Sequence, residues 1–293
     1  MFGKAKIGIA FGGGGARGIT HIGVIKALEE HGLKFDHISG TSAGSIVGSA
    51  WAYGMNWKEM YKLAKEMNLK DIRTNVIPLM PSKTDGIQQI LKNNFGDINI
   101  EELSTPFTAI AVDLKSTKEI VISHGNLAKA VAGSCAVPGV FVPVEFDDML
   151  LADGGLQNNI PADVLRHFDC DYVIAVDCNK SRLYGTDSSK VVDVISCSIR
   201  ILMKSNSIKG YIWSDLVVGP ETKRFKSTKL EGIDEMIEEG YNETIDMMPQ
   251  IRALFKKKKP LVPKKKPSKK DVLFVWLVKE NITSQHEVGF FIW

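Results

Sequence analysis

The sequence lacks any apolar run as long as the ~18–20 residues that a membrane-spanning helix needs. Its four cysteines, Cys135, Cys170, Cys178 and Cys197, form no C-x-x-C pair and have no histidine pattern beside them. We therefore expect reduced thiols that pack among apolar neighbours, with neither a disulfide framework nor a metal site and no cofactor. A strand pattern already begins at Lys6, which argues against a secretory signal and favours the cytoplasm.

Acidic and basic residues are unevenly distributed along the 293 residues. The net charge is +3, yet residues 1–255 alone carry −4, and residues 256–270 hold nine lysines and no acid. The sequence thus predicts a single folded domain over residues 1–255, a Lys/Pro-rich linker over residues 256–270 and a short apolar tail over residues 271–293. A run of this kind is usually a solvated linker.

Strand and helix patterns alternate along the chain. Strands are predicted at residues 6–11, 35–39, 107–113, 119–123, 149–152, 172–177 and 215–218. Helices are predicted at residues 19–30, 43–52, 57–67, 86–94, 128–134, 191–204 and 233–255. Strands separated by helix-length segments favour a mostly parallel sheet covered on both faces, so the predicted fold is a three-layer α/β/α domain.

A glycine turn follows the second predicted strand and has the spacing G-x-S-x-G. Gly40 and Gly44 bracket Ser42, and a helix is predicted directly after them. This spacing is typical of a nucleophile elbow, where a strained strand-to-helix corner exposes the serine Oγ. Ser42 is therefore the predicted nucleophile.

A second glycine turn, from Gly12 to Gly18, follows the first predicted strand. Backbone N–H groups of Gly13, Gly14 and Gly15 at a helix start can hold an oxyanion. Arg17 lies in the same turn, and we expect it to brace the loop or to meet an anionic head group.

The same turn also fits G-x-G-x-x-G, the dinucleotide fingerprint, from Gly13 to Gly18. That fingerprint requires an acid at the far end of the second strand, whereas Asp36 stands at its beginning. A P-loop is excluded because Ile19 and Thr20 stand where Lys and Ser or Thr are needed. Dinucleotide binding remains the alternative interpretation.

A third motif, Asp153-Gly154-Gly155, ends an apolar strand. With it the chain resembles the patatin-like phospholipases, whose pattern is a G-G-G-x-R/K-G loop, a G-x-S-x-G elbow and a D-G-G/A motif in that order. The resemblance covers roughly residues 6–179, and the compact form is similar to the small bacterial members. It implies a serine acyl hydrolase that uses no cofactor.

The resemblance also implies a Ser–Asp dyad in place of a triad. None of the six histidines lies in a loop that must meet Ser42, and His21 falls inside the first predicted helix. Carried over from the family, Asp153 would accept the Ser42 proton and later activate the deacylating water. An unperturbed carboxylate has a pKa near ~4, so its surroundings and the oxyanion hole must contribute much of the rate.

Two segments are candidates for contact with lipid. Residues 74–81 form an apolar, proline-bounded stretch that reads as a lid over an acyl pocket or as a buried connector. The lysine run from Lys256 to Lys270 would be attracted to anionic membrane at about 1 kcal/mol per lysine. Nucleic acid is not expected as a partner because no aromatics interleave the lysines. The apolar tail reads as strands that dock on the core or as interfacial anchors. A lipid-binding module without turnover is the remaining alternative to an enzyme.

Overall fold

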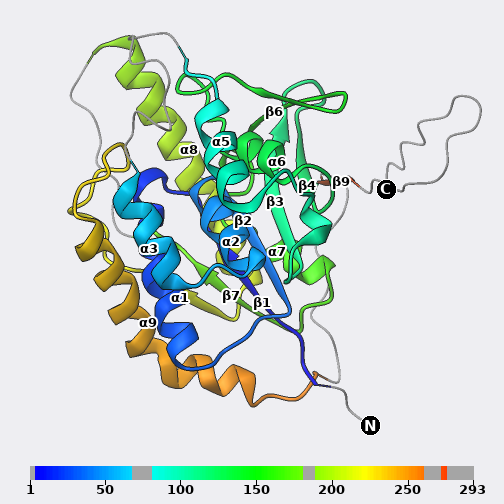
Figure 1. Ribbon diagram of the computed structural model, residues 1–293, viewed down its shortest axis with the longest axis vertical. Coiled ribbons are helices and arrows are strands. Elements are labelled where there is room, and N and C mark those ends of the chain that lie inside the picture. Colours follow the sequence, from blue (N-terminus) through cyan, green and yellow to red (C-terminus); the bar gives the residue numbers. More distant parts are fainter. Residues whose placement is uncertain (1–3, 68–80, 181–188, 261–271, 276–293) are drawn as a thin grey trace, which may run out of the picture.

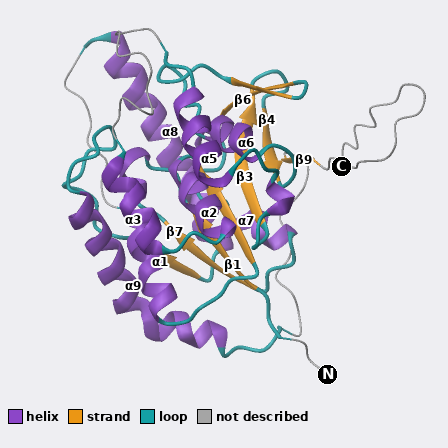
Figure 2. Ribbon diagram, viewed as in Figure 1, coloured by secondary structure: helices purple, strands orange, loops and turns teal. Residues whose placement is uncertain are grey.

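The computed structural model describes residues 4–67, 81–180 and 189–260, and the backbone of residues 272–275. Residues 74–80 of the predicted lid and most of the predicted linker and tail lie outside these ranges. In the described part, strands form one central sheet and helices pack on both of its faces (Figures 1 and 2). The predicted three-layer α/β/α fold is confirmed.

The sheet contains the seven predicted strands, each close to its predicted position, together with β5 and β9. They are β1 (Ile7–Phe11), β2 (His37–Thr41), β3 (Phe107–Asp113), β4 (Lys118–Ile122), β5 (Val144–Phe146), β6 (Met149–Asp153), β7 (Tyr172–Val176), β8 (Leu216–Val218) and β9 (Val272–Val275). Their order is β5-β6-β3-β2-β1-β7-β8, with β4 paired to β3 and β9 to β4. Neighbours from β3 through β2, β1 and β7 to β8 are parallel, whereas β4 and β6 run antiparallel to β3.

The helices connect these strands and cover the sheet. They are α1 (Thr20–Glu30), α2 (Ala43–Tyr53), α3 (Trp57–Glu66), α5 (Asp85–Phe95), α6 (Leu127–Ser134), α7 (Ala162–His167), α8 (Val191–Trp213) and α9 (Ile233–Phe255). Two short 3-10 helices overlap the motifs: η1 (Gly15–Ile19) begins within the Gly12–Gly18 turn, and η3 (Gly154–Leu156) begins within the Asp153-Gly154-Gly155 motif.

Strand β1 shows why the sheet needs helices on both faces. All five of its residues are buried, as expected for a parallel strand in the centre of a covered sheet. Ile9 and Phe11 belong to the large core cluster that contains residues of α1, α2 and α9. Ala10 belongs to a second cluster, in which Leu165 of α7 packs and Tyr211 of α8 lies beside it.

Three elements differ from the sequence expectation. Helix α8 continues to Trp213, nine residues beyond its predicted end at residue 204, and both β5 and the six-residue α7 were not predicted. Within the predicted tail, Val272–Val275 forms β9, which pairs in parallel with β4 from Glu119 to Ile122. Of the two interpretations of the tail, the structure therefore has a docked strand at these four residues.

Candidate active site

Ser42 occupies a sharp turn between β2 and α2. Its φ of 52° and ψ of −127° place a non-glycine residue in a strained region of backbone space. Gly40 and Gly44 permit this turn: a Cβ on Gly44 would lie 2.2 Å from the carbonyl oxygen of Phe11, and one on Gly40 would lie 2.4 Å from the carbonyl oxygen of Gly44. The Ser42 N–H donates to Ser134 Oγ at 2.9 Å, which anchors the corner to the end of α6.

The register of β3 explains how Asp153 comes to lie beside Ser42. Strand β4 occupies one side of β3 from Ala109 to Asp113. On the other side, parallel β2 ends with Thr41 opposite Ile110, and antiparallel β6 ends with Asp153 opposite Ala111. The carboxyl ends of β2 and β6 therefore meet end to end at neighbouring positions of one strand.

Asp153 is fully buried, and its carboxyl group has an unusual environment. Its Oδ1 accepts the Gly155 N–H at 2.8 Å, whereas Oδ2 has no hydrogen-bond partner among the described residues. Burial raises the pKa of Asp153 from 3.8 to about 6, although the nearby Ser42 hydroxyl and the Gly155 amide act in the opposite direction. Such a carboxylate is a stronger base than an exposed one and is still mostly ionised at neutral pH.

The glycine loop after β1 places its amides unequally. Gly12 donates its N–H to Val176 at 2.9 Å, and Gly13 donates to the carbonyl oxygen of Asn159 at 3.0 Å. Gly14 and Gly15 have no amide hydrogen bond within the described part of the chain. Gly15 also has a φ of 58°, which favours glycine. Of the three amides predicted to donate to an oxyanion, that of Gly13 already donates to Asn159. The amides of Gly14 and Gly15 are the two that could still donate to a bound oxyanion.

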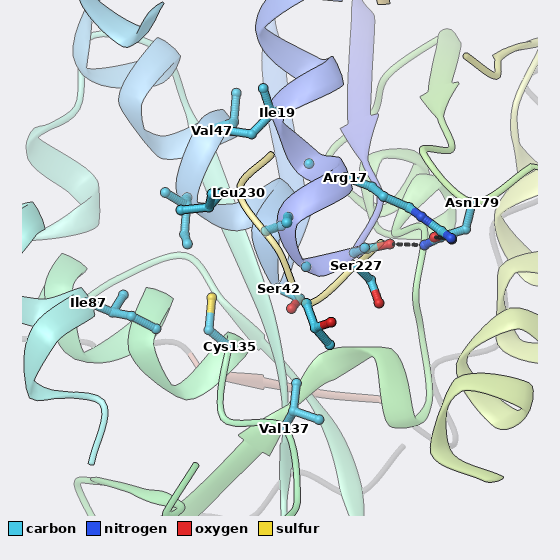
Figure 3. A pocket seen from close by; sticks show the side chains of 18 of the residues that line it. Arg17, Ile19, Ser42, Val47, Ile87, Cys135, Val137, Asn179, Ser227 and Leu230 are labelled. Atoms are coloured by element: carbon cyan, nitrogen blue, oxygen red, sulfur yellow. Dashed lines mark hydrogen bonds between the residues drawn. The ribbon is translucent and has the colours of Figure 1, made fainter. Parts of the chain in front are cut away.

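The side chains of Asn179 and Arg17 fix the glycine loop through hydrogen bonds. Asn179 Nδ2 donates to the Gly13 carbonyl oxygen at 2.7 Å, and Arg17 donates from its guanidinium to Asn179 Oδ1 at 2.9 Å (Figure 3). Arg17 is buried and also donates to the carbonyl oxygen of Phe225 at 2.9 Å. Of the two roles expected for Arg17, these contacts favour bracing.

No hydrogen bond joins an imidazole to Ser42 among the described residues. His21 is fully buried in α1, where its Nε2 lies 2.8 Å from the Gly12 carbonyl oxygen. Burial lowers the pKa of His21 to about 4, so this ring is neutral at neutral pH. His37 Nε2 bonds the Thr108 hydroxyl instead.

Ser42 opens into a cavity of about 350 Å³ whose walls are mainly aliphatic (Figure 3). The glycine loop and Ser42 form one part of the wall, and helices α2, α3, α5 and α8 and the segment that follows α6 contribute to the rest. Cys135 lines the cavity, and burial together with the charge of Asp153 raises the pKa of its thiol. The apolar lining includes Ile46, Val47, Met60, Leu63, Ile87, Val140 and Leu230. Such a cavity suits a hydrocarbon chain whose reactive end lies at Ser42.

Asp36 is not placed to bind the ribose of a dinucleotide at the glycine loop. Asp36 lies before β2 and its Oδ2 accepts the Ile7 N–H at 2.7 Å, at the opposite end of the strand from Ser42. Within the described ranges we find no His, Cys, Asp or Glu cluster that could hold a metal ion. The same ranges contain no helix long and apolar enough to cross a membrane.

Some of the site was not visible in the sequence. Ser42, Asp153 and the glycine loop lie together as expected, and Gly154 packs close to β3, where a Cβ would lie 2.2 Å from the Ile110 carbonyl oxygen. The sequence predicts no chemical role for Ser134, Asn159 or Asn179, although Asn159 is expected to fix the turn after the Asp153 motif. Their contacts with the motif backbone come from pairings distant in sequence, and their spacing offers no signal for them.

Comparison with known proteins places this site in a family. Residues 9–166 match the family described as Patatin-like phospholipase. An uncharacterized NTE family protein of Mycobacterium bovis is 36% identical over 180 residues, covering 60% of this chain and 50% of the relative. Patatin-like phospholipase domain-containing protein 6 of Mus musculus is 31% identical over 230 residues, covering 75% of this chain and 16% of the relative. The chain thus spans half or less of the length of these relatives.

Among solved structures, VipD from Legionella pneumophila has the same fold, with a TM-score of 0.56 at 15% identity over 85% of this chain and 67% of VipD. The family match covers more than half of the chain and includes the glycine loop, the Ser42 elbow and the Asp153 motif. This chain belongs to the patatin-like phospholipase family.

Proposed function

We propose that this chain is a serine lipid acyl hydrolase that cleaves carboxylic esters through an acyl-enzyme on Ser42. The observation that carries the proposal is the strained Ser42 corner, which opens into an apolar cavity while Asp153 lies at the neighbouring register position of β3. The cavity has room for an acyl chain, and the strand ends bring a nucleophile and a base to its wall. Family membership supports the same class of reaction.

In the proposed acylation step, Asp153 takes the Ser42 hydroxyl proton as Oγ attacks the ester carbonyl carbon. The amides of Gly14 and Gly15 donate to the oxyanion of the tetrahedral intermediate. When the intermediate collapses, the ester C–O bond breaks and the leaving alcohol takes the proton from Asp153.

Deacylation repeats these steps with a water molecule as the nucleophile in place of the Ser42 hydroxyl. Asp153 accepts a proton from the water that attacks the acyl carbon, the bond to Ser42 Oγ breaks, and the proton returns to Oγ. The fatty acid leaves and both residues regain their starting states. This cycle assigns Asp153 the base role that histidine has in a conventional triad.

A panel of lipid esters tests the proposal. Phospholipid, lysophospholipid and triacylglycerol substrates, together with a soluble short-chain ester, should include at least one that releases fatty acid with the parent chain. The matched variant Ser42→Ala should release none. A parent chain that binds lipid but hydrolyses no ester would favour the alternative, a lipid-binding module without turnover.

For the lysine-rich segment we propose peripheral attachment of a cytoplasmic enzyme to anionic membrane. Nine lysines at residues 256–270 stand beside a domain of net charge −4, and attraction of this kind weakens as the Debye length falls from ~10 Å at 0.1 M salt to about 3 Å at 1 M. Replacing the nine lysines by glutamine, which leaves β9 in place, should abolish salt-sensitive binding to phosphatidylglycerol vesicles. Equal vesicle binding by the parent chain and the glutamine variant at low salt would mean that the segment acts only as a linker.

A further inference from the structure

Helix α8 carries an exposed face without a single charged residue. The exposed positions recur every three or four residues along its length, as on one face of a helix. They are Val191, Val194, Ile195, Ser198, Ile201, Leu202, Ser205, Ile208 and Ile212. We call this set the α8 stripe; from end to end it extends about 30 Å at the ~1.5 Å rise of an α-helix.

Large apolar side chains are concentrated on this stripe. Of the ten exposed large hydrophobic residues in the described part of the chain, seven belong to it, and Val191 and Ile212 are 68% and 67% exposed. Surface helices normally turn charged and polar residues to solvent and their apolar stripe to the core. A contiguous exposed apolar surface marks an interaction site.

The orientation of α8 is fixed by contacts on its opposite face. Lys209 pairs with Glu119 at 2.8 Å and with Asp163 at 2.7 Å, and both carboxylates are buried. Gly210 packs so close to Ile160 that a Cβ would lie 2.5 Å away, and Tyr211 donates to the buried Asp177. Because these contacts hold the inner face, the stripe cannot turn into the core, and α8 lies at the periphery of the molecule (Figure 1).

The inner face of the same helix lines the acyl cavity. Ile199, Arg200 and Met203 are among the cavity-lining residues, and they alternate along the helix with stripe residues such as Ile201 and Leu202. The stripe and the cavity are therefore two faces of one helix. A surface that binds the stripe lies within one helix diameter, about 10 Å, of the chamber that would receive an acyl chain.

We propose that the α8 stripe docks on a lipid surface and seats the enzyme where its substrate resides; this rests on the proposed lipid hydrolase function. The composition favours lipid over a protein partner. Energetically dominant residues of protein interfaces are enriched in Trp, Tyr and Arg, and the stripe has none of them. It offers only aliphatic side chains and two serines, which suits insertion among acyl chains at a membrane interface.

Charges around the stripe fit the same occupant. Three basic residues of α8 lie away from the stripe: Lys209 pairs with Glu119 and Asp163, Lys204 pairs with Asp177, and Arg200 lines the cavity. Lys190 is exposed directly before the first stripe residue. An apolar face that carries no exposed charge and has a cation at its first turn matches a helix that lies in the plane of a membrane surface.

Vesicle binding by a catalytically inactive full chain tests the proposal without any contribution from turnover. Ser42→Ala should co-sediment with phosphatidylcholine vesicles, and binding should persist at about 1 M salt, where attraction to lysines is screened. In that background Leu202→Asn should lower vesicle partitioning about tenfold, and the triple change Ile195→Asn, Leu202→Asn and Ile208→Asn should abolish it. The matched control is Leu114→Asn, because Leu114 is an exposed leucine outside α8, and it should bind like the parent.

Several outcomes would overturn the lipid assignment. Equal partitioning of the Leu202 and Leu114 variants would do so, as would a parent that binds no vesicle. A parent that is dimeric by analytical ultracentrifugation, with a monomeric triple variant and no vesicle binding, would assign the stripe to a second copy of this chain. Hydrolysis of a soluble short-chain ester by the triple variant carrying Ser42 separates the two proposals. Its retention with loss of vesicle binding supports docking, whereas vesicle binding by a parent that hydrolyses no ester contradicts only the proposed reaction.

Discussion

The backbone N–H of Gly13 donates to the carbonyl oxygen of Asn159 at 3.0 Å, which joins the glycine loop to the segment that follows Asp153. Asn159 also approaches this loop with its buried side chain, whose Nδ2 donates to Ser207 Oγ of α8 at 3.0 Å. Asn159, six residues after the proposed base, therefore links the loop of the proposed oxyanion hole to α8. Because the Gly13 amide donates to Asn159, we propose that the amides of Gly14 and Gly15 bind the oxyanion.

Asn179 is predicted to position the oxyanion loop. Asn179→Ala removes the shortest side-chain hydrogen bond to the Gly13 carbonyl oxygen and leaves only the longer ones from Asn159 and Cys178, so the amides of Gly14 and Gly15 should lose their alignment. We expect kcat to fall about ten- to hundredfold, somewhat less than the loss of a direct oxyanion donor, while KM changes little. Steady-state kinetics with a soluble ester measures both.

The control for this change is Asn94→Ala, since Asn94 is exposed and its side chain donates to the Ile90 carbonyl oxygen of its own helix. It should leave kcat and KM as they are. A parent-like kcat in a folded Asn179→Ala protein would show that the Asn179 contact does not position the loop.

The pH dependence of the reaction should report Asp153. Only the ionised carboxylate accepts a proton from Ser42, and its pKa is raised to about 6, so kcat/KM should rise from pH 5 to pH 7 with a midpoint near 6. Replacing the partly buried imidazole in His31→Ala should leave this profile unchanged, because His31 Nδ1 bonds the Ala27 carbonyl oxygen at the end of its own helix. A midpoint that moves or disappears in His31→Ala would contradict the assignment.

The same burial predicts a cost in stability. A folded-state pKa raised above the ordinary 3.8 favours the protonated form, so this contribution to stability is full below pH 4 and is lost as pH rises through 6. At neutral pH the ionised Asp153 should cost on the order of 3 kcal/mol. Asp153→Asn, whose amide oxygen still accepts the Gly155 N–H, should therefore melt several degrees above the parent at pH 7.

Thermal melts at several pH values check this prediction. The advantage of Asp153→Asn should shrink as pH falls from 7 and should vanish near pH 4. A constant difference across this range would show that ionisation of Asp153 is not its cause.

The strained backbone of Ser42 leads to a prediction about protein stability that is independent of catalysis. Glycine adopts a φ of 52° and a ψ of −127° without a Cβ penalty, and alanine does not. Ser42→Gly should therefore be more stable than Ser42→Ala by about 1 kcal/mol, although both lack the nucleophile. Equal denaturation midpoints for the two variants would mean that the turn is relaxed.

The sequence predicted those parts of the fold and site that are local. Each motif follows a short apolar strand, so the glycine loop, the Ser42 turn and the Asp153 motif could be placed at strand ends from spacing alone. The meeting of Ser42 and Asp153 depends on β6 running antiparallel to β3 and occupying the side that β2 leaves, which is a pairing between distant segments. No periodicity encodes such a register.

Helix α8 shows a second limit of sequence patterns. Its predicted end at residue 204 precedes Ser205, Asn206 and Ser207, polar residues that interrupt the apolar pattern. In the structure Ser207 is buried and bonds Asn159, whereas aliphatic residues of the α8 stripe face solvent. The usual assignment of apolar residues to the core fails here because this helix turns apolar residues outward.

Covalent labelling tests the central proposal, an acyl-enzyme on Ser42, most directly. The full chain is treated with a lipophilic fluorophosphonate at neutral pH, and the modified residue is identified by peptide mass spectrometry. We predict one adduct on Ser42, complete loss of ester hydrolysis in the labelled protein, and no adduct in Ser42→Ala. Labelling of a different residue with Ser42 unmodified, or full hydrolytic activity in Ser42→Ala, would contradict the account.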